Sequence, residues 1–373
     1  MKLFNISLDL GGSTLRSTVD GKVVDILDSK TKHVTDVTIK DISIDPYGEF
    51  RIIQSPLIDL VNSKSDFYVK GESGANYSGL DIFPHNQEKK VKQDATFINM
   101  MYAIGYSLSK YSPKVLNSVP VAVAICVPAK ERYEETTGET FIHNISGDYC
   151  IEFPRLNSEY WFNLNAKTIL LQSEGVVSFS DYIQKERKVD YAKRKTFLVI
   201  DAGYRSTEIV LIGNQKSYTY SAASPALGGI TLESEVEASS VSSGYFSQDI
   251  RRVVATGEII HQGVVIAAGS AVRAAKQQLA NRLIPKIIEV TSKTREVENI
   301  NNISDLFVTG RCFHSEGFGD KETGDLSMYL LKGLNLNIPV HRSNPLGESN
   351  VLGAYNQLIR YLVKNKFIEE NVQ

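Results

Sequence analysis

The chain has 373 residues, of which 42% are hydrophobic and 23% charged, as in ordinary globular proteins long enough for two domains. Its 41 basic and 43 acidic residues give a net charge of −2, which provides no electrostatic footprint for nonspecific binding to DNA or membranes. The three cysteines lack metal-ligand spacing, and we expect no secretory leader and no membrane span, since no apolar run reaches about 18 residues. These features predict a cytoplasmic protein without a membrane partner.

The first pattern is a hairpin with a turn of nearly bare backbone. An apolar run over residues 6–10 contains Asp9, and a second strand-like run covers residues 15–19. Backbone N–H groups and hydroxyls in such a turn can converge on an anion, whereas the carboxylate is suited to hold a metal ion, directly or through water. A plain tight hairpin is the alternative interpretation. The turn consists of Gly11, Gly12, Ser13 and Thr14.

Residues 197–207 repeat this pattern. Asp201, Gly203 and Ser206 stand at a constant offset from the aspartate, the first glycine and the threonine of the first loop. A two-residue turn signal follows each copy, so each predicts a three-strand meander. An internal repeat of this kind predicts two similar domains that bind one anion with both loops.

Between the two loops the pattern alternates strands and helices. Residues 22–60 are expected to form sheet and loops, and the polar segment 66–92 a surface subdomain. Residues 94–110 are apolar on nearly all sides and predict a buried helix. The proline-bounded apolar run 120–128 predicts a central parallel strand. Further strands are expected over residues 147–153 and 168–171.

Gln172 and Glu174 follow at a strand-to-helix junction, where α/β sheets usually place active groups. An ordinary carboxylate at a helix N-terminus is the alternative interpretation of Glu174. Gly228 and Gly229 predict another loop that opens a helix. Later elements are an amphipathic helix over 270–294, a strand ending at Gly310 and a helix that begins near residue 349.

The overall pattern is α/β, without the P-loop or Rossmann signatures. Five stretches, in order, resemble motifs of the actin, hexokinase and heat-shock chaperone ATPase superfamily. Residues 9–14 and 201–207 resemble its two phosphate loops, and 172–177 its first connecting motif. Residues 308–312 resemble its adenosine loop and 349–353 its second connecting motif. Within the superfamily, the chain is most similar to bacterial ParM-type plasmid-partition actins.

The resemblance implies two duplicated actin-like, ribonuclease H-like domains that face a nucleotide cleft. Domain I would comprise residues 1–172 and 340–373, with an inserted subdomain at about 33–95. Domain II would comprise residues 173–339, with an insertion at about 230–300.

The resemblance also implies roles for the loop residues. The first loop would bind the β-phosphate side, and Gly203, Ser206 and Thr207 the γ-phosphate. Asp9 and Asp201 would hold water ligands of Mg²⁺. Glu174, with Asp201 helping, would position the attacking water, and Gln172 is the second candidate for this role.

The adenosine loop departs from the superfamily pattern, which has further glycines after the first. Arg311 and Cys312 follow Gly310 instead. Arg311 would stack on the purine, or both residues are ordinary loop and core positions. Tyr204 and Arg205 likewise replace small residues in the second loop.

The function implied by the resemblance is an actin-like ATPase or GTPase that forms dynamic filaments of its own copies for plasmid DNA segregation. A small DNA-binding adaptor, not the chain itself, would contact the DNA. The alternative is a small-molecule kinase of the same fold that transfers the γ-phosphate to a metabolite. A nucleotide-dependent scaffold that does not hydrolyse is a third interpretation.

Overall fold

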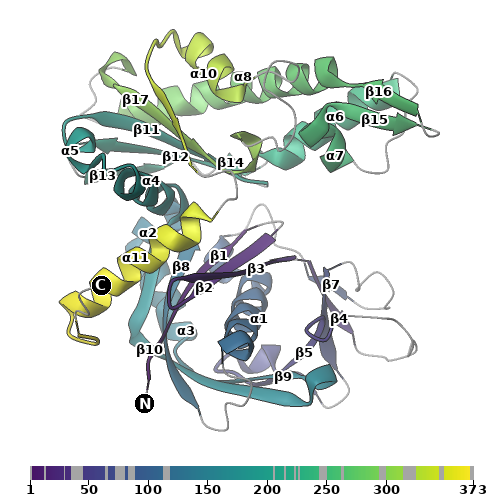
Figure 1. Cartoon of the computed structure of the whole chain (residues 1–373), viewed down its shortest axis with the longest axis vertical. Helices are drawn as coiled ribbons and strands as arrows, with labels where there is room; N and C mark the ends of the chain where they lie inside the picture. Colours follow the sequence, from purple (N-terminus) through teal and green to yellow (C-terminus); the bar gives the residue numbers. More distant parts are fainter. Residues whose placement is uncertain are drawn as a thin grey trace. The chain divides into compact units, whose positions relative to one another are not determined.

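A computed structural model of the chain divides into two compact units, Met1–Val177 with Asn350–Gln373 (unit 1) and Ser178–Ser349 (unit 2) (Figure 1). The sequence predicted 173–339 for the second domain. The unit boundary lies instead within helix α4 (Glu174–Lys185), and unit 2 continues to Ser349. The structure describes residues 2–11, 14–28, 30–34, 45–63, 66–71, 80–82, 89–111, 118–204, 206–213, 216–221, 224–225, 227–242, 250–261, 264–293, 300–313, 325–343 and 348–369.

The described strands of unit 1 form one sheet in the order β3-β2-β1-β8-β10-β9-β5-β6-β4-β7. The strands of the predicted insertion thus extend the main sheet through the pairing of β5 with β9. At its centre β1, β8 and β10 are parallel, so their carboxyl ends lie at one edge. The strands are β1 (Phe4–Leu10), β2 (Thr14–Val19), β3 (Lys22–Asp28), β4 (Thr31–Val34), β5 (Glu49–Gln54), β6 (Phe67–Lys70), β7 (Leu80–Ile82), β8 (Val119–Val127), β9 (Gly147–Phe153) and β10 (Ser158–Ser173).

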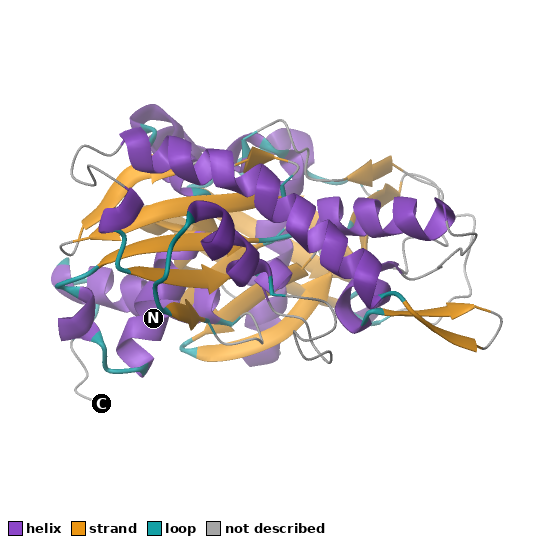
Figure 2. Cartoon of the chain, turned by 90° about the horizontal axis from the view of Figure 1, so that it is seen from above, coloured by secondary structure: helices purple, strands orange, loops and turns teal. Residues whose placement is uncertain are grey.

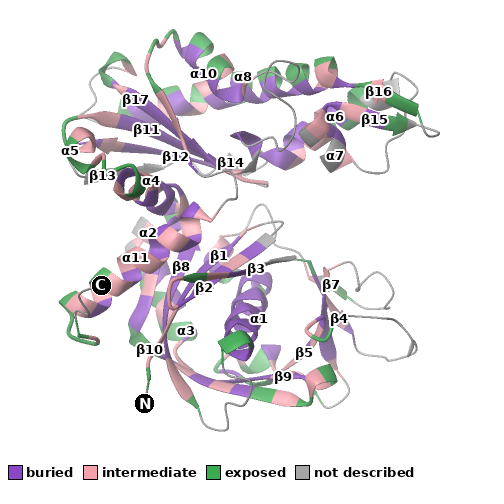
Figure 3. Cartoon of the chain, in the orientation of Figure 1, coloured by how far each residue is buried: buried purple, intermediate pink, exposed green. Residues whose placement is uncertain are grey.

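Strand β8 is buried on both faces, as its continuous apolar sequence predicted. Val123 and its neighbours on one face join the core that includes α1 (Asp94–Tyr111), which is buried along most of its length (Figure 3). Ala122 and Ala124 on the other face pack with α11 (Ser349–Lys364). In α11, a Cβ at Gly353 would lie 2.1 Å from the carbonyl oxygen of Val177, so only glycine permits this approach.

The remaining helices of unit 1 are short. They are α2 (Ala129–Tyr133), α3 (Glu135–Asn144) and the 3₁₀ helices η1 (Ile58–Leu60), η3 (Lys90–Lys92) and η4 (Pro154–Leu156). Helix η3 directly precedes α1 and packs beside α3, which places a charged turn close to the start of the buried helix.

The sheet of unit 2 repeats the centre of unit 1. Its order is β13-β12-β11-β17-β18, and β14 also pairs with β12. Like β1, β11 has an antiparallel hairpin partner on one side and a parallel strand on the other. The strands are β11 (Thr196–Ala202), β12 (Ser206–Gly213), β13 (Lys216–Ser221), β14 (Ser224–Pro225), β17 (Asp305–Thr309) and β18 (Val340–Arg342).

Helices cover both faces of this sheet. Leu198 and Ile200 face a core shared with α8 (Gly269–Lys293) and α10 (Leu326–Leu334). On the opposite face, the Phe179 ring of α4 lies 4.7 Å from the Phe197 ring and 5.5 Å from the Phe307 ring. Other helices are α5 (Val189–Ala192), α6 (Gly229–Ser242), α7 (Ile250–Thr256), η5 (Ile300–Asn302) and η6 (Arg311–Phe313).

A small hairpin, β15 (Glu258–His261) with β16 (Val264–Ala267), extends past the helices (Figure 2). Within the described residues, no helix combines the length and apolar character required to cross a bilayer. Cys126, Cys150 and Cys312 are buried free thiols.

The structure confirms both predicted meanders, the buried helix after residue 94 and the central parallel strand. Asp20 and Gly21 have left-handed φ values of 46° and 82°, which a two-residue turn between β2 and β3 requires. The helix predicted over 270–294 is α8, which continues through Pro285.

Candidate functional site

The first predicted loop joins β1 to β2, and Asp9 lies near the end of β1 with only 6% of its surface exposed. The Nδ2 of Asn350, at the start of α11, donates a hydrogen bond to Asp9 Oδ2 (3.1 Å). Ser7 Oγ donates to the carbonyl oxygen of Val351 (2.7 Å). The second connecting motif therefore fixes the end of β1 and orients its carboxylate. Gly11 is described, whereas Gly12, Ser13 and the side chain of Thr14 lie outside the described residues.

Three parallel strands bring the predicted residues of unit 1 to one edge. Cys126 of β8 is in register with Asp9 on one side and with Gln172 of β10 on the other. Glu174 is the first residue of α4, directly after β10. Because these strand ends coincide, Asp9, Gln172 and Glu174 gather at the same edge of the sheet.

Glu174 forms an ion pair that the sequence did not predict. Lys90 Nζ of η3 donates to Glu174 Oε1 (2.5 Å) and to the carbonyl oxygen of Cys126 (3.3 Å). The side chains are 17% and 19% exposed, so both charges are largely removed from water. Burial alone would lower the pKa of the Lys90 ammonium, but the carboxylates of Glu174 and Asp9 outweigh burial and raise this pKa above its ordinary value. Lys90 is therefore a cation beside two of the predicted site carboxylates.

Arg16 is a second cation near the first loop. It stands directly opposite Asp9 in the β1–β2 hairpin. Its Nε is buried and has no hydrogen-bond partner in the part of the chain that the structure describes. A buried guanidinium N–H without a protein acceptor is a suitable donor for an anionic ligand.

The second predicted loop, in unit 2, is held by backbone hydrogen bonds. Asp201 is 6% exposed near the end of β11. The N–H of Gly203 donates to the carbonyl oxygen of Ser206 (3.0 Å), and the N–H of Gly229 donates to that of Gly203 (3.0 Å). The carbonyl oxygen of Gly228 accepts from the N–H of Thr231 (3.0 Å) in the first turn of α6. The loop and the start of α6 are thus one connected structure.

Two side chains of the second loop have partners inside unit 2. Thr207 is fully buried, and its hydroxyl donates to the carbonyl oxygen of Leu227. The Tyr204 hydroxyl donates to Glu233 Oε2 (2.8 Å) on α6. A Cβ at Gly229 would lie 3.1 Å from the Tyr204 ring, so this glycine provides room for the tyrosine. Arg205 lies outside the described residues.

The predicted adenosine loop follows β17, the parallel neighbour of β11. Thr309 is in register with Asp201, and Gly310 has a left-handed φ of 89°. A Cβ at Gly310 would lie 2.5 Å from both Asp201 Oδ1 and the carbonyl oxygen of Ala202, so only glycine fits. Cys312 Sγ lies 3.4 Å from the carbonyl oxygen of Gly203. The side chain of Arg311 lies outside the described residues.

The structure therefore gathers the described site residues into one group in each unit. Sequence analysis missed Lys90 and Arg16. The register of the predicted hairpin could have indicated Arg16, because it places this residue opposite Asp9. Lys90 stands in the run Lys89-Lys90-Val91-Lys92, and no pattern separates it from neighbouring surface lysines.

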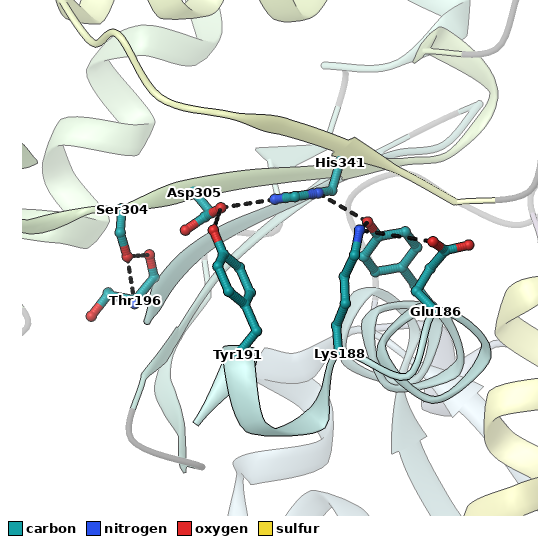
Figure 4. A network of polar contacts seen from close by, with 8 residues as sticks. Glu186, Lys188, Tyr191, Thr196, Ser304, Asp305 and His341 are labelled. Carbon is teal, nitrogen blue, oxygen red and sulfur yellow. Dashed lines mark hydrogen bonds and ion pairs between the residues drawn. The ribbon is translucent and has the colours of Figure 1, made fainter. Parts of the chain in front are cut away.

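A different polar network lies at the opposite end of β17 (Figure 4). Asp305 is fully buried, and its Oδ1 accepts from the Tyr191 hydroxyl (2.7 Å) and lies 2.8 Å from His341 Nε2. His341 Nδ1 lies 2.9 Å from the Tyr182 hydroxyl, which accepts from Lys188 Nζ (2.7 Å). The hydrogen bond to Asp305, with burial, raises the pKa of Tyr191 to about 12. These hydrogen bonds offset the cost of burying the Asp305 carboxylate. The network lies at the amino end of β17, away from the loops.

The strand orders, the repeated hairpin loop and the carboxylates at strand ends define an actin-like α/β fold. No model of a known protein family and no curated protein sequence matches the chain. Solved structures do match it over nearly its whole length.

One similar structure is the actin-like protein Alp7A, with a TM-score of 0.68 and 11% identity over 100% of both chains. Another is a 15-stranded ParM filament from Clostridium botulinum, with a TM-score of 0.67 and 16% identity over 96% of this chain and 100% of that one. A third is Bacillus thuringiensis ParM with AMPPNP, with a TM-score of 0.63 and 12% identity over 98% and 100%. The chain thus has an actin-like fold similar to that of ParM, which confirms the predicted fold class.

Proposed function

We propose that the chain is a polymerising actin-like protein that binds and hydrolyses ATP or GTP with Mg²⁺. The observation that carries the proposal is the duplicated strand end. In each unit an aspartate lies near the end of a central strand that has a hairpin partner on one side and a parallel strand on the other. In each unit, a carboxylate beside a backbone-rich turn suits a metal–polyphosphate ligand. The similarity to a ParM solved with AMPPNP supports the choice of a nucleotide.

The ligand contacts that we propose come from both loops, which bind the same triphosphate. The first loop donates backbone and hydroxyl hydrogen bonds to the β-phosphate, and the second loop contacts the γ-phosphate. The nucleoside lies against the glycine-rich segments of unit 2. The proposed contacts are Gly11, Gly12, Ser13, Thr14, Gly203, Ser206, Thr207, Gly228, Gly229, Gly310, Arg311 and Cys312.

In the proposal, Asp9 and Asp201 hold water ligands of a magnesium ion. Both carboxylates are nearly buried, and Asn350 orients that of Asp9. Among the described residues no group of three or more His, Cys, Asp or Glu side chains could enclose a metal ion. Two carboxylates agree with Mg²⁺ chemistry, because this ion keeps several waters and takes few protein ligands. When bound, the ion neutralises charge on the phosphates.

Glu174 orients the attacking water in this proposal, with Asp201 assisting and Gln172 as the second candidate. Glu174 begins α4 at the strand edge that also holds Asp9. A carboxylate in this position accepts a proton from water as the bond to phosphorus forms.

The filament and cargo parts of the proposal are supported by similarity to a ParM filament. A subunit contact that does not close on itself produces an open polymer. We propose that the cargo is plasmid DNA, held through a small DNA-binding adaptor, in the cytoplasm.

Light scattering and negative-stain electron microscopy at tens of micromolar protein test the function. We expect polymer with ATP or GTP plus Mg²⁺, and loss of polymer when EDTA removes the ion. Absence of polymer under every nucleotide condition would overturn the filament function. Turnover that depends on an added metabolite, without polymer, would instead indicate the small-molecule kinase.

A further inference from the structure

Lys90 is fixed in place by contacts that involve its backbone as well as its side chain. Glu131 of α2 accepts hydrogen bonds from the backbone N–H of Lys90 (3.0 Å) and of Val91 (3.0 Å). The neighbouring Lys89 forms an ion pair with Glu134, just after α2. Helix η3 is thus attached to α2, which follows β8 directly. These contacts hold the Lys90 ammonium at the strand edge that carries Asp9 and Glu174.

The ammonium of Lys90 has capacity for another acceptor. An ammonium carries three N–H donors. Among the described residues, Lys90 uses them on Glu174 Oε1 and on the carbonyl oxygen of Cys126. Its charge faces the carboxylates of Glu174 and Asp9, and its raised pKa keeps it protonated at neutral pH. The Lys90 ammonium is therefore protonated both with and without a bound ligand.

The ion pair also occupies the carboxylate that must orient water. Lys90 Nζ donates to Glu174 Oε1 at 2.5 Å, so the ammonium competes with a water for the lone pairs of this oxygen. A doubly charged terminal phosphate is a stronger acceptor for an ammonium than one carboxylate oxygen.

We infer that Lys90 is a positioning residue that exchanges Glu174 for the terminal phosphate of a bound nucleoside triphosphate. The exchange rests on the proposed function of this site. The exchange has two consequences. The triphosphate gains a charge-assisted hydrogen bond from Lys90, and Glu174 becomes available to accept from water. A diphosphate has no terminal phosphate at that position and leaves the Lys90–Glu174 pair intact. Lys90 thereby makes the site sensitive to the nucleotide state.

The test measures Kd for Mg²⁺–ADP and for a non-hydrolysable Mg²⁺–ATP analogue on full-length variants. Lys90→Met should weaken the triphosphate analogue by about 10- to 100-fold and change ADP by less than about twofold. Lys90→Arg should restore most of the preference, since it keeps the charge. Lys92→Met is the matched control, because Lys92 is an exposed lysine of the same turn, and both affinities should stay unchanged.

A second arm tests the competition directly and does not depend on the folding of Lys90→Met. Glu174→Gln removes the competing charge and should tighten binding of the triphosphate analogue by about threefold or more. The same change on a Lys90→Met background should have no such effect. Thermal unfolding verifies that each variant is folded.

Equal loss of ADP and triphosphate affinity in Lys90→Met, or no loss beyond that of Lys92→Met, would overturn the inference. So would unchanged triphosphate affinity in Glu174→Gln. Failure of the unmodified protein to bind either nucleotide would instead overturn the proposed function, which separates the two outcomes.

Discussion

The two hairpin loops of the chain share a backbone pattern but differ in charge. Asp9 stands opposite Arg16 in unit 1, whereas Asp201 stands opposite Glu208 at the equivalent position of unit 2. Lys90 adds a second cation beside the loop of unit 1. In unit 2 the loop is held by backbone hydrogen bonds to α6. The repeat therefore preserves strand geometry, while the cations that we identify belong to unit 1.

This difference suggests that the two units have different roles in the proposed site. Unit 1 would neutralise the phosphates and orient the water, and unit 2 would contribute mainly backbone groups. Substitutions in unit 1 should then change affinity and turnover, and substitutions in unit 2 should act through loop geometry.

The largest effect is expected for Glu174→Ala in unit 1. Loss of the carboxylate that orients water should lower the rate of phosphate release by about 10²- to 10⁴-fold. Nucleotide binding should persist, and filaments should live longer because hydrolysis no longer weakens them. Phosphate release and sedimentation over time measure both effects. Glu186→Ala, which removes an exposed carboxylate just after the same helix, serves as control, and unchanged turnover in Glu174→Ala would exclude the proposed role.

A smaller effect is expected when the residues opposite the two aspartates are exchanged for neutral ones. Arg16→Met should weaken nucleotide binding by about 10- to 100-fold, because the phosphates lose a charged hydrogen-bond donor. Glu208→Gln, at the equivalent position of unit 2, should change the affinity by less than about threefold. Isothermal titration at one fixed salt concentration compares them. If both variants bind equally well, the charge difference between the units has no role in binding.

Much of the fold follows from local sequence patterns. The run from residue 120 to 128 predicts β8 because both of its faces are apolar, and the repeated aspartate–glycine pattern predicts the two hairpins. Gly310 marks a turn, and the structure shows that a left-handed φ and the nearby Asp201 both require it. These features depend on residues within one or two elements.

Other features depend on contacts between distant segments. Lys90 has a special environment only because η3 packs onto α2 beside Glu174, which no sequence spacing reveals. The unit boundary falls within α4 because Val177 and Phe179, two residues apart, pack in different units. The hydroxyl of Thr207 likewise has a partner that no local pattern predicts, because it donates to the carbonyl oxygen of Leu227 in a later segment of the chain.

The smallest effect is expected for Gly310→Ala in unit 2. Alanine is strained at a φ of 89°, and its Cβ would lie 2.5 Å from Asp201 Oδ1 and from the carbonyl oxygen of Ala202. Relief of this clash must move the turn or the end of β11, at an expected cost of about 1–2 kcal/mol in the free energy of unfolding.

Gly203→Ala is the matched control for this change. Its Cβ would meet its nearest neighbour, the carbonyl oxygen of Ser206, at an ordinary 3.4 Å. We therefore expect Gly203→Ala to unfold at nearly the unmodified temperature and Gly310→Ala to unfold several degrees lower. Hydrogen exchange should locate the loss of protection in β11 and β17 and leave β1 and β8 unchanged. Equal stability of the two variants would show that the loop of unit 2 tolerates displacement, and its backbone geometry would then not be the property that the unit contributes.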